Sequence, residues 1–267
     1  MQEIFLDANG IRFRCRLDGP EGAPWLVFSN SLLTDLSLWD AQVEALSGRF
    51  RILRYDQRGH GGTQVPEEPA SFDQLAADAE ALMAQLGAGR ATFVGVSMGA
   101  ATGLLLAARA PGRVAALIAS DGQAGTAPGG AEAWQERIDT VSRGGMEAIV
   151  EPTVRRWFSP ASLAAGNPAT ERVRAMIRGT PEAGFVACAR ALQSYDLRVL
   201  MPQLKQPVLL VAGATDGAMP QTMRRMADDI PNARFIEIAE AGHLPCIERP
   251  DAFNEAIRDF LAEHSDR

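Results

Sequence analysis

The stretch Ala91-Thr-Phe-Val-Gly-Val-Ser-Met-Gly-Ala-Ala101 places Ser97 between two glycines, where an apolar β-rich run meets a run of small residues. The apolar run predicts a buried strand, and the small residues that follow begin a segment with helical periodicity. Gly95-Val-Ser-Met-Gly99 fits a nucleophile elbow, in which the serine lies on a strained strand-to-helix turn and glycines allow the two elements to approach closely. The stretch therefore predicts a nucleophilic Ser97 at the carboxyl end of a strand.

Similar short apolar runs recur along the chain and predict further strands. These runs are 25–28, 51–55, 115–118, 208–211 and 234–238. The segments between them show helical periodicity over 38–46, 72–86, 100–110, 222–229 and 252–263. Residues 1–18 alternate around Asn9-Gly10, which is typical of a β-hairpin. Strands that alternate with helices predict an α/β fold, with a mostly parallel twisted sheet and helices on both faces.

One region interrupts this alternation. Residues 128–195 show helical periodicity and no convincing strand, and Gly/Pro-rich stretches at 122–130 and 201–207 flank them. We therefore expect a helical cap, or lid, at 125–198, inserted into a core formed by 1–124 and 199–267.

Composition limits the classes of partner. The chain has 267 residues and a formal net charge of −7, so it lacks the basic field that nucleic acid binding needs. Cys15, Cys188 and Cys246 form no CxxC pair, which predicts reduced core thiols rather than disulfides or a zinc site. No run reaches the length of a membrane span and no signal peptide is evident. We expect a cytoplasmic enzyme for a small molecule, without metal, cofactor, nucleic acid or membrane partner.

A serine nucleophile needs a histidine base, and the chain has three histidines. His264 lies in the C-terminal tail, where we expect fraying. His60 falls in a loop after an earlier strand, and we expect it to shape that loop. His243 follows the last predicted strand, at the same edge of the sheet as Ser97. His243 is therefore the candidate base.

The histidine needs a carboxylate to hold its tautomer and stabilise the imidazolium. Two aspartates follow predicted strands at the correct edge of the sheet, Asp121 after 115–118 and Asp216 after 208–211. The chain order serine, acid, histidine, with the acid after the later strand, favours Asp216. Asp121 is the alternative, or an anchor for the hinge of the cap.

Acyl transfer also needs an oxyanion hole of backbone amides. The residue after the nucleophile, Met98, lies at the start of the following helix, where the helix dipole assists. The second donor is expected from the loop 29–32 after the strand 25–28, with Ser31 as the candidate.

The residues quoted so far resemble an α/β-hydrolase, and more narrowly the 3-oxoadipate enol-lactonases of bacterial aromatic catabolism. The resemblance is carried by Phe28 to Asp40, Leu53 to Gly61, the elbow, and the segments 133–138 and 156–158. It implies hydrolysis of a small enol-lactone to 3-oxoadipate, without a metal or cofactor. The sequence departs from the family pattern at Leu33, where a glycine is usual, at Gly217 and at Pro245.

The substrate is less well specified by the sequence. Residues 128–195 carry eight arginines against seven acidic residues, about +1, whereas the rest of the chain is near −8. An anionic substrate is consistent with this difference. Trp134 is a candidate for lining the acyl pocket, or else belongs to the core of the cap. A carboxylesterase or lactonase for another substrate, a non-catalytic receptor, and C–C bond cleavage or perhydrolysis on the same groups remain alternatives.

Overall fold

The computed structural model describes residues 1–264 and contains one eight-stranded sheet, in the order β1-β2-β4-β3-β5-β6-β7-β8. The strands are β1 (Gln2–Ala8), β2 (Ile11–Asp18), β3 (Trp25–Ser29), β4 (Arg51–Tyr55), β5 (Ala91–Val96), β6 (Val114–Ser120), β7 (Val208–Gly213) and β8 (Ala233–Ile238). β2 is antiparallel to both of its neighbours, β1 and β4. The strands β3 to β8 run parallel to one another. The predicted α/β fold and all of its predicted strands are confirmed.

The antiparallel edge begins with a tight turn. Asn9 and Gly10 both adopt positive φ, 48° and 75°, and connect β1 to β2 directly. Positive φ at both central residues is the conformation of a type I′ turn, whose twist matches that of the flanking strands. The predicted hairpin is therefore confirmed.

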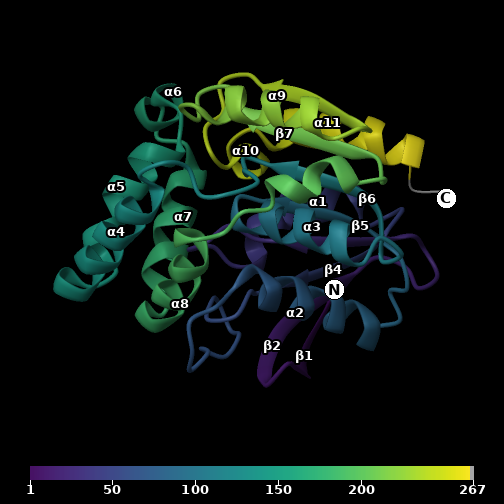
Figure 1. Ribbon diagram of the computed structural model, residues 1–267, viewed down its shortest axis with the longest axis horizontal. Helices are drawn as coiled ribbons and strands as arrows, with labels where there is room; N and C mark the ends of the chain where they lie inside the picture. Colours follow the sequence, from purple (N-terminus) through teal and green to yellow (C-terminus); the bar gives the residue numbers. More distant parts are fainter. Residues whose placement is uncertain (265–267) are drawn as a thin grey trace.

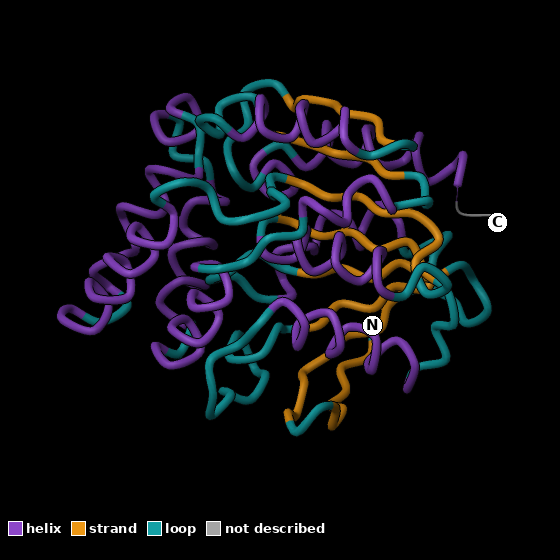
Figure 2. Tube along the Cα trace, viewed as in Figure 1, coloured by secondary structure: helices purple, strands orange, loops and turns teal. Residues whose placement is uncertain are grey.

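Helices cover both faces of the sheet (Figures 1 and 2). The core helices are η1 (Leu36–Trp39), α1 (Asp40–Leu46), α2 (Phe72–Gln85), α3 (Met98–Arg109), η2 (Arg198–Gln203), α9 (Met219–Asp229), α10 (Pro245–Glu248) and α11 (Pro250–His264). α2 packs on α3, whereas α1 packs on α11. α1 and α11, which are far apart in the chain, are thereby brought together.

Five α-helices that precede η2 in the segment between β6 and β7 form the mass at the left of Figure 1. They are α4 (Gly130–Gly144), α5 (Glu147–Trp157), α6 (Pro160–Ala164), α7 (Pro168–Gly179) and α8 (Glu182–Gln193). α4 packs on α5 and α8, and α5 packs on α7. We call α4–α8 the cap; its proposed limits at residues 125 and 198 stay a prediction.

Buried side chains form one core cluster that runs from the sheet into the cap. The three cysteines are buried and free, as predicted, and burial raises the pKa of the Cys15 and Cys188 thiols to about 12. None of the helices in residues 1–264 is both long and apolar enough to cross a membrane.

Candidate active site

Ser97 lies between the last residue of β5 and the first residue of α3, with φ 55° and ψ −112°. This strained backbone is held by close approaches at both glycines of the motif. A Cβ on Gly95 would lie 2.2 Å from the carbonyl oxygen of Gly99, and one on Gly99 would lie 2.1 Å from that of Ser29. No side chain fits in either position, so the glycines make the elbow possible.

His243 and Asp216 meet in the loops after β8 and β7. The two side chains are joined by a hydrogen bond of 2.7 Å between His243 Nδ1 and Asp216 Oδ2. Thr215 ties the two loops together, because its amide and its hydroxyl both donate to the carbonyl oxygen of Ala241, each at 2.8 Å. With Nδ1 bound to the carboxylate, Nε2 is the nitrogen left to exchange a proton with a nucleophile.

Ser97 and His243 line the same cavity, of about 170 Å³, between the carboxyl ends of the strands and the cap. This volume is below the roughly 300–1,000 Å³ of sites for drug-sized ligands. The cavity therefore suits a small molecule, which would lie against both Ser97 and His243.

Asp121, the alternative acid, lies beside Asp216 and His243, and polar side-chain atoms of the three residues lie within 4.8 Å of one another. Asp121 is buried, and its two oxygens accept hydrogen bonds from Gly213 N at 2.8 Å and Ser120 Oγ at 2.6 Å. Burial, and then the negative charge of Asp216, raise the pKa of Asp121 well above its usual range. A neutral Asp121 can donate a hydrogen bond to the Asp216 carboxylate. Asp216 is then the residue that partners His243.

These three residues are also the one group within residues 1–264 whose donor atoms are close enough to hold a metal ion. Their donor atoms already serve other partners: both Asp121 oxygens accept protein hydrogen bonds, and His243 Nδ1 is bound to Asp216. This hydrogen-bonded arrangement fits proton transfer rather than a metal centre.

The other two histidines lie away from the cavity. His60 is fully buried, with Nδ1 hydrogen bonded to the carbonyl oxygen of Arg58 at 3.0 Å, inside the loop after β4. His264 does not belong to a frayed segment, contrary to our expectation: it is the last residue of α11 and its ring packs edge-on against Phe260. Neither imidazole lines the cavity of Ser97.

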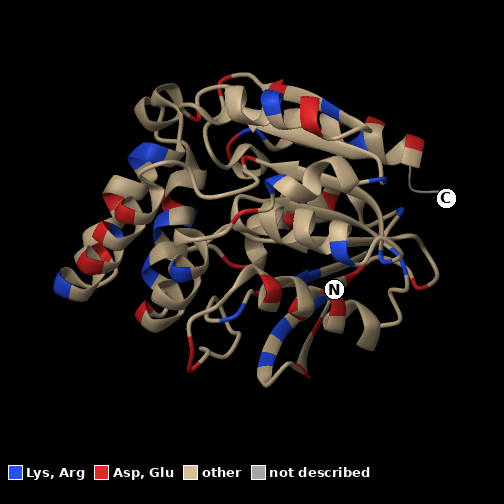
Figure 3. Ribbon diagram, in the orientation of Figure 1, with Lys and Arg blue, Asp and Glu red and all other residues tan. Residues whose placement is uncertain are grey.

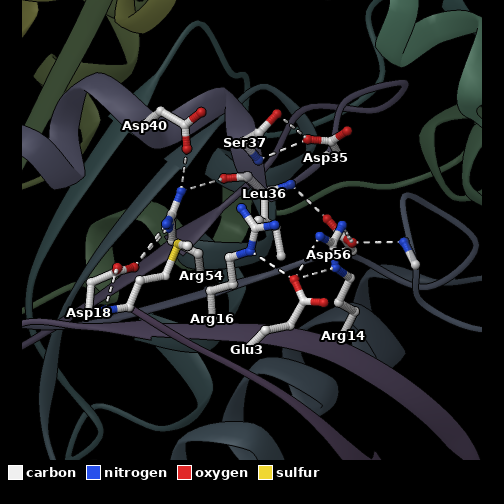
Figure 4. Close-up of polar contacts among 12 residues, drawn as sticks. Glu3, Arg14, Arg16, Asp18, Asp35, Leu36, Ser37, Asp40, Arg54 and Asp56 are labelled. Atoms are coloured by element: carbon white, nitrogen blue, oxygen red, sulfur yellow. Dashed lines mark hydrogen bonds and ion pairs between the residues drawn. The ribbon is translucent and has the colours of Figure 1, made fainter.

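The loop expected to supply the second oxyanion donor is fixed by β4. Asn30 Nδ2 donates to the carbonyl oxygen of Tyr55 at 3.0 Å. Further along the loop, the amide of Leu36 donates to Asp56 at 2.6 Å and its carbonyl oxygen accepts from Arg54 at 3.3 Å (Figure 4). Burial raises the pKa of Asp56 to about 6. A loop held at several points can present a backbone amide without reorganisation.

Met98 is the first residue of α3, as expected for a donor at a helix N-terminus. Ser31 is buried, and its carbonyl oxygen accepts hydrogen bonds from Thr34. Leu32, the next residue, lines the cavity, whereas Ser31 does not. The backbone amide of Leu32 is therefore a candidate oxyanion donor beside that of Ser31. The loop sequence could not show which of the two neighbouring residues faces the cavity.

Leu33, at the departure from the family pattern, adopts φ 68° although it is fully buried. This left-handed conformation costs about 1–2 kcal/mol for a residue with a Cβ. The turn that glycine usually supplies is therefore retained, and burial of the leucine side chain offsets the strain.

A family model for the alpha/beta hydrolase fold matches residues 24–250, most of the chain. The chain belongs to the alpha/beta hydrolase fold family.

Relatives of this alpha/beta hydrolase share nearly its whole length. It is 33% identical over 257 residues to 3-oxoadipate enol-lactonase 2 of Acinetobacter baylyi, covering 96% of this chain and 95% of the relative. The crystal structure of the enol-lactonase from Burkholderia xenovorans LB400 is similar with a TM-score of 0.92 and 37% identity, covering 97% of this chain and all of the other. A thermophilic esterase from Thermogutta terrifontis, solved with malate bound, gives 0.91 and 30% identity, with 98% and 99% covered.

One buried carboxylate of this alpha/beta hydrolase was not predicted from the sequence. Glu248, at the end of α10, accepts hydrogen bonds from the amide of Gly242 at 2.7 Å and from the amide and hydroxyl of Ser159 at 2.9 and 2.6 Å. It connects the loop of His243 to the start of α6 in the cap. In the sequence, Glu248 is seen only as an acidic residue five positions after His243. This spacing does not show whether its side chain is buried or lies on the surface.

The cap supplies much of the cavity wall of the alpha/beta hydrolase. Trp134, the proposed lining residue, borders the cavity, and so do Arg137, Arg156 and Trp157 of the same region. The two arginines are placed by the fold of α4 and α5. Both arginines lie in the segments 133–138 and 156–158 that carry the family resemblance, but residue type and spacing gave neither a place at the cavity.

Proposed function

We propose that this alpha/beta hydrolase cleaves a small carboxylic ester or lactone through an acyl-enzyme on Ser97, with 3-oxoadipate enol-lactone as its substrate. The observation that carries the proposal is the shared cavity: the strained Ser97 and the carboxylate-bound His243 line it together. The names of the relatives from Acinetobacter baylyi and Burkholderia xenovorans support the choice of lactone.

In the proposed reaction, Ser97 Oγ attacks the lactone carbonyl while His243 Nε2 takes the hydroxyl proton and Asp216 stabilises the imidazolium. The Met98 amide and an amide of the loop, from Ser31 or Leu32, hold the oxyanion. Collapse of the intermediate breaks the ring C–O bond, and His243 returns the proton to the leaving enol oxygen. Water, deprotonated by His243, then attacks the acyl carbon and releases the acid and Ser97.

A carboxylesterase acting on another small anionic ester is the second candidate. The thermophilic esterase from Thermogutta terrifontis, with malate bound, favours it, because that protein is similar over nearly the whole chain and its bound molecule is a dicarboxylate. Both candidates use the same Ser97 chemistry and differ in the acyl and leaving groups that the cavity admits.

Hydrolysis of 3-oxoadipate enol-lactone, with the product identified by mass spectrometry, tests the proposal against a panel of small esters. We expect turnover of the lactone, and a loss of at least about 10⁴-fold in kcat for Ser97→Ala. A serine-directed phosphonate should form one adduct on the parent and none on this variant. Lactone binding without turnover or adduct would favour a receptor, whereas turnover confined to other esters would favour the carboxylesterase.

A further inference from the structure

The loop after β3 carries two candidate oxyanion donors, the backbone amides of Ser31 and Leu32. No hydrogen bond within residues 1–264 uses either amide, although both residues are only 1% exposed. A buried amide without an acceptor is unfavourable unless a ligand supplies one. Of the two residues, Leu32 lines the cavity of Ser97 and Ser31 does not, so the Leu32 amide is the better placed to meet an oxyanion there.

The direction of the Leu32 amide is set by the carbonyl group of Ser31. These two groups belong to one peptide unit, which is planar and trans, so its C=O and N–H bonds point in opposite directions. Thr34 donates two hydrogen bonds to this carbonyl oxygen, from Oγ1 at 2.9 Å and from its amide at 3.3 Å. Thr34 therefore holds the C=O bond on its own side and directs the N–H bond of Leu32 away from itself.

Residues 31–34 form a tight turn, which the bond between the Thr34 amide and the Ser31 carbonyl closes. Leu33 is the third residue of this turn and has φ 68°, the positive value that a type II turn requires at that position. A residue with a Cβ is strained there, so loss of a hydrogen bond would let the turn relax toward another backbone conformation. The bond from Thr34 Oγ1, the shorter of the two, opposes that relaxation.

The two ends of the loop are fixed independently of this turn. Before the turn, Gln57 Nε2 donates to the carbonyl oxygen of Asn30 at 2.5 Å. After the turn, the amide of Leu36 donates to Asp56 at 2.6 Å (Figure 4). Loss of the Thr34 hydroxyl would therefore leave both ends in place and loosen the turn between them.

We propose that Thr34 is a positioning residue, whose hydroxyl orients the Leu32 amide toward the oxyanion that forms when Ser97 attacks a carbonyl. Thr34 does not line the cavity, so it acts through the peptide unit and not by touching the substrate. This inference rests on the proposed function, because it requires acyl transfer at Ser97. It selects Leu32 over Ser31 as the donor and assigns the side chain that fixes it.

Thr34→Val and Thr34→Ser separate the hydroxyl from the shape of the side chain. Valine keeps the branched shape without the hydrogen bond, whereas serine keeps the hydroxyl. For 4-nitrophenyl acetate, we expect Thr34→Val to lower kcat roughly 10- to 100-fold and to change KM less than about threefold, because a displaced oxyanion donor costs less than the roughly 10²- to 10³-fold of a removed one. Thr34→Ser should keep kcat within about threefold of the parent. Thr34→Ala replaces Thr34→Val if valine prevents folding.

Inhibition by 1,1,1-trifluoro-2-butanone reports on the oxyanion without turnover. Ser97 Oγ adds to the ketone carbon, the hydroxyl proton passes to His243, and the carbonyl oxygen becomes an oxyanion that mimics the tetrahedral intermediate. The inhibition constant should rise in Thr34→Val by about the factor by which kcat falls. In Thr34→Ser it should stay near the parent value.

Thr180→Val is the matched control. Thr180 is buried like Thr34, and its hydroxyl donates to the carbonyl oxygen of Met176 at the same distance, 2.9 Å, at the end of α7 in the cap. Ion pairs that join α7 to α5, at charged positions of the two helices in Figure 3, remain in this variant. Thr180→Val should lower the melting temperature as Thr34→Val does, but keep the parent kcat and inhibition constant.

The results distinguish failure of this inference from failure of the proposed function. Parent-like kcat and inhibition in folded Thr34→Val would show that the hydroxyl does not position the amide. Equal losses in Thr34→Val and Thr34→Ser would assign the effect to packing and also overturn the inference. A parent that forms no adduct with the serine-directed phosphonate would refute the proposed function, and the oxyanion role of Thr34 with it.

Discussion

The indole ring of Trp157 stacks on the imidazole ring of His243, with the ring centroids 5.3 Å apart and the planes inclined by 27°. The carbonyl oxygen of Trp157 also accepts the amide proton of His243 at 2.7 Å. A residue at the end of a cap helix thus holds the candidate base by both its side chain and its backbone. The cap therefore takes part in positioning His243 as well as in enclosing the cavity.

Replacement of Trp157 tests the stacking contact. We expect Trp157→Phe to keep a flat ring beside His243 and to lower kcat less than about fivefold, since aromatic pairs contribute about 0.5–1.5 kcal/mol beyond burial. Trp157→Ala should lower kcat at least tenfold and destabilise the protein by about 3–5 kcal/mol. Steady-state kinetics with thermal melts check both effects. Parent-like kcat in a folded Trp157→Ala protein would show that the indole does not position the base.

The two aspartates near His243 can be separated by isosteric substitution. Asp216→Asn should lower kcat by about 10⁴-fold, because an amide cannot stabilise the imidazolium and favours the wrong tautomer. Asp121→Asn should cost less than about tenfold, because the raised pKa of Asp121 favours its neutral form and an amide can likewise donate a hydrogen bond to Asp216. Kinetics on one ester substrate decide the matter. The reverse order of losses would make Asp121 the catalytic acid.

Glu248→Gln examines the link between the histidine loop and the cap. Glutamine offers one oxygen in place of two, so either Gly242 or Ser159 would face an NH₂ donor. We expect a loss of about 1–3 kcal/mol in stability, the cost of a buried unsatisfied amide, and a lower kcat. Glu240→Gln, an exposed change in the same loop, should alter neither. Unchanged kcat and stability in Glu248→Gln would contradict a positioning role.

His60 gives the protein a stability that depends on pH. Burial lowers the pKa of His60 to about 4, so between about pH 6.5 and pH 4 the unfolded chain binds a proton that the folded chain does not. Stability contributed by the neutral His60 is therefore lost as the pH falls through this window, by up to about 3 kcal/mol.

His60→Gln should remove this dependence. Urea unfolding at several pH values would then show that the parent loses more stability than the variant as the pH falls from 6.5 to 4. A constant difference across that range would mean that His60 is not neutral in the folded protein. The experiment compares the two proteins because Asp56, with its pKa raised to about 6, titrates in part of the same range.

The central strands and the elbow were predictable from the sequence because they depend on local pattern: continuous apolar runs, and glycines where a Cβ would collide with backbone. The short helix α10 was not predicted, and α6 was not distinguished within the helical region 128–195, because each has fewer than two turns. Helical periodicity cannot be recognised over four or five residues.

The site was predictable only in part. The relation between Asp121 and Asp216 depends on how two strands far apart in the chain align, and both residues follow a strand at the same edge. The contacts of Glu248, and the positions of Arg137 and Arg156 at the cavity, depend on how the cap packs on the core. Such contacts between the core and the cap are set by tertiary packing, so residue type and spacing could not reveal them.

The hydrogen bonds of Glu248 limit how the cap of this enzyme can move. Because Glu248 and Trp157 connect residues 157–159 to the loop of His243, the cap cannot move away as one body without displacing His243, the candidate base, relative to Ser97. Exchange of reactant and product would then need a movement of other parts of the cap, such as α4, which packs on α5 and α8. Heating that breaks the contacts of Glu248 and Trp157 with the His243 loop would abolish turnover at a temperature below that at which the sheet unfolds.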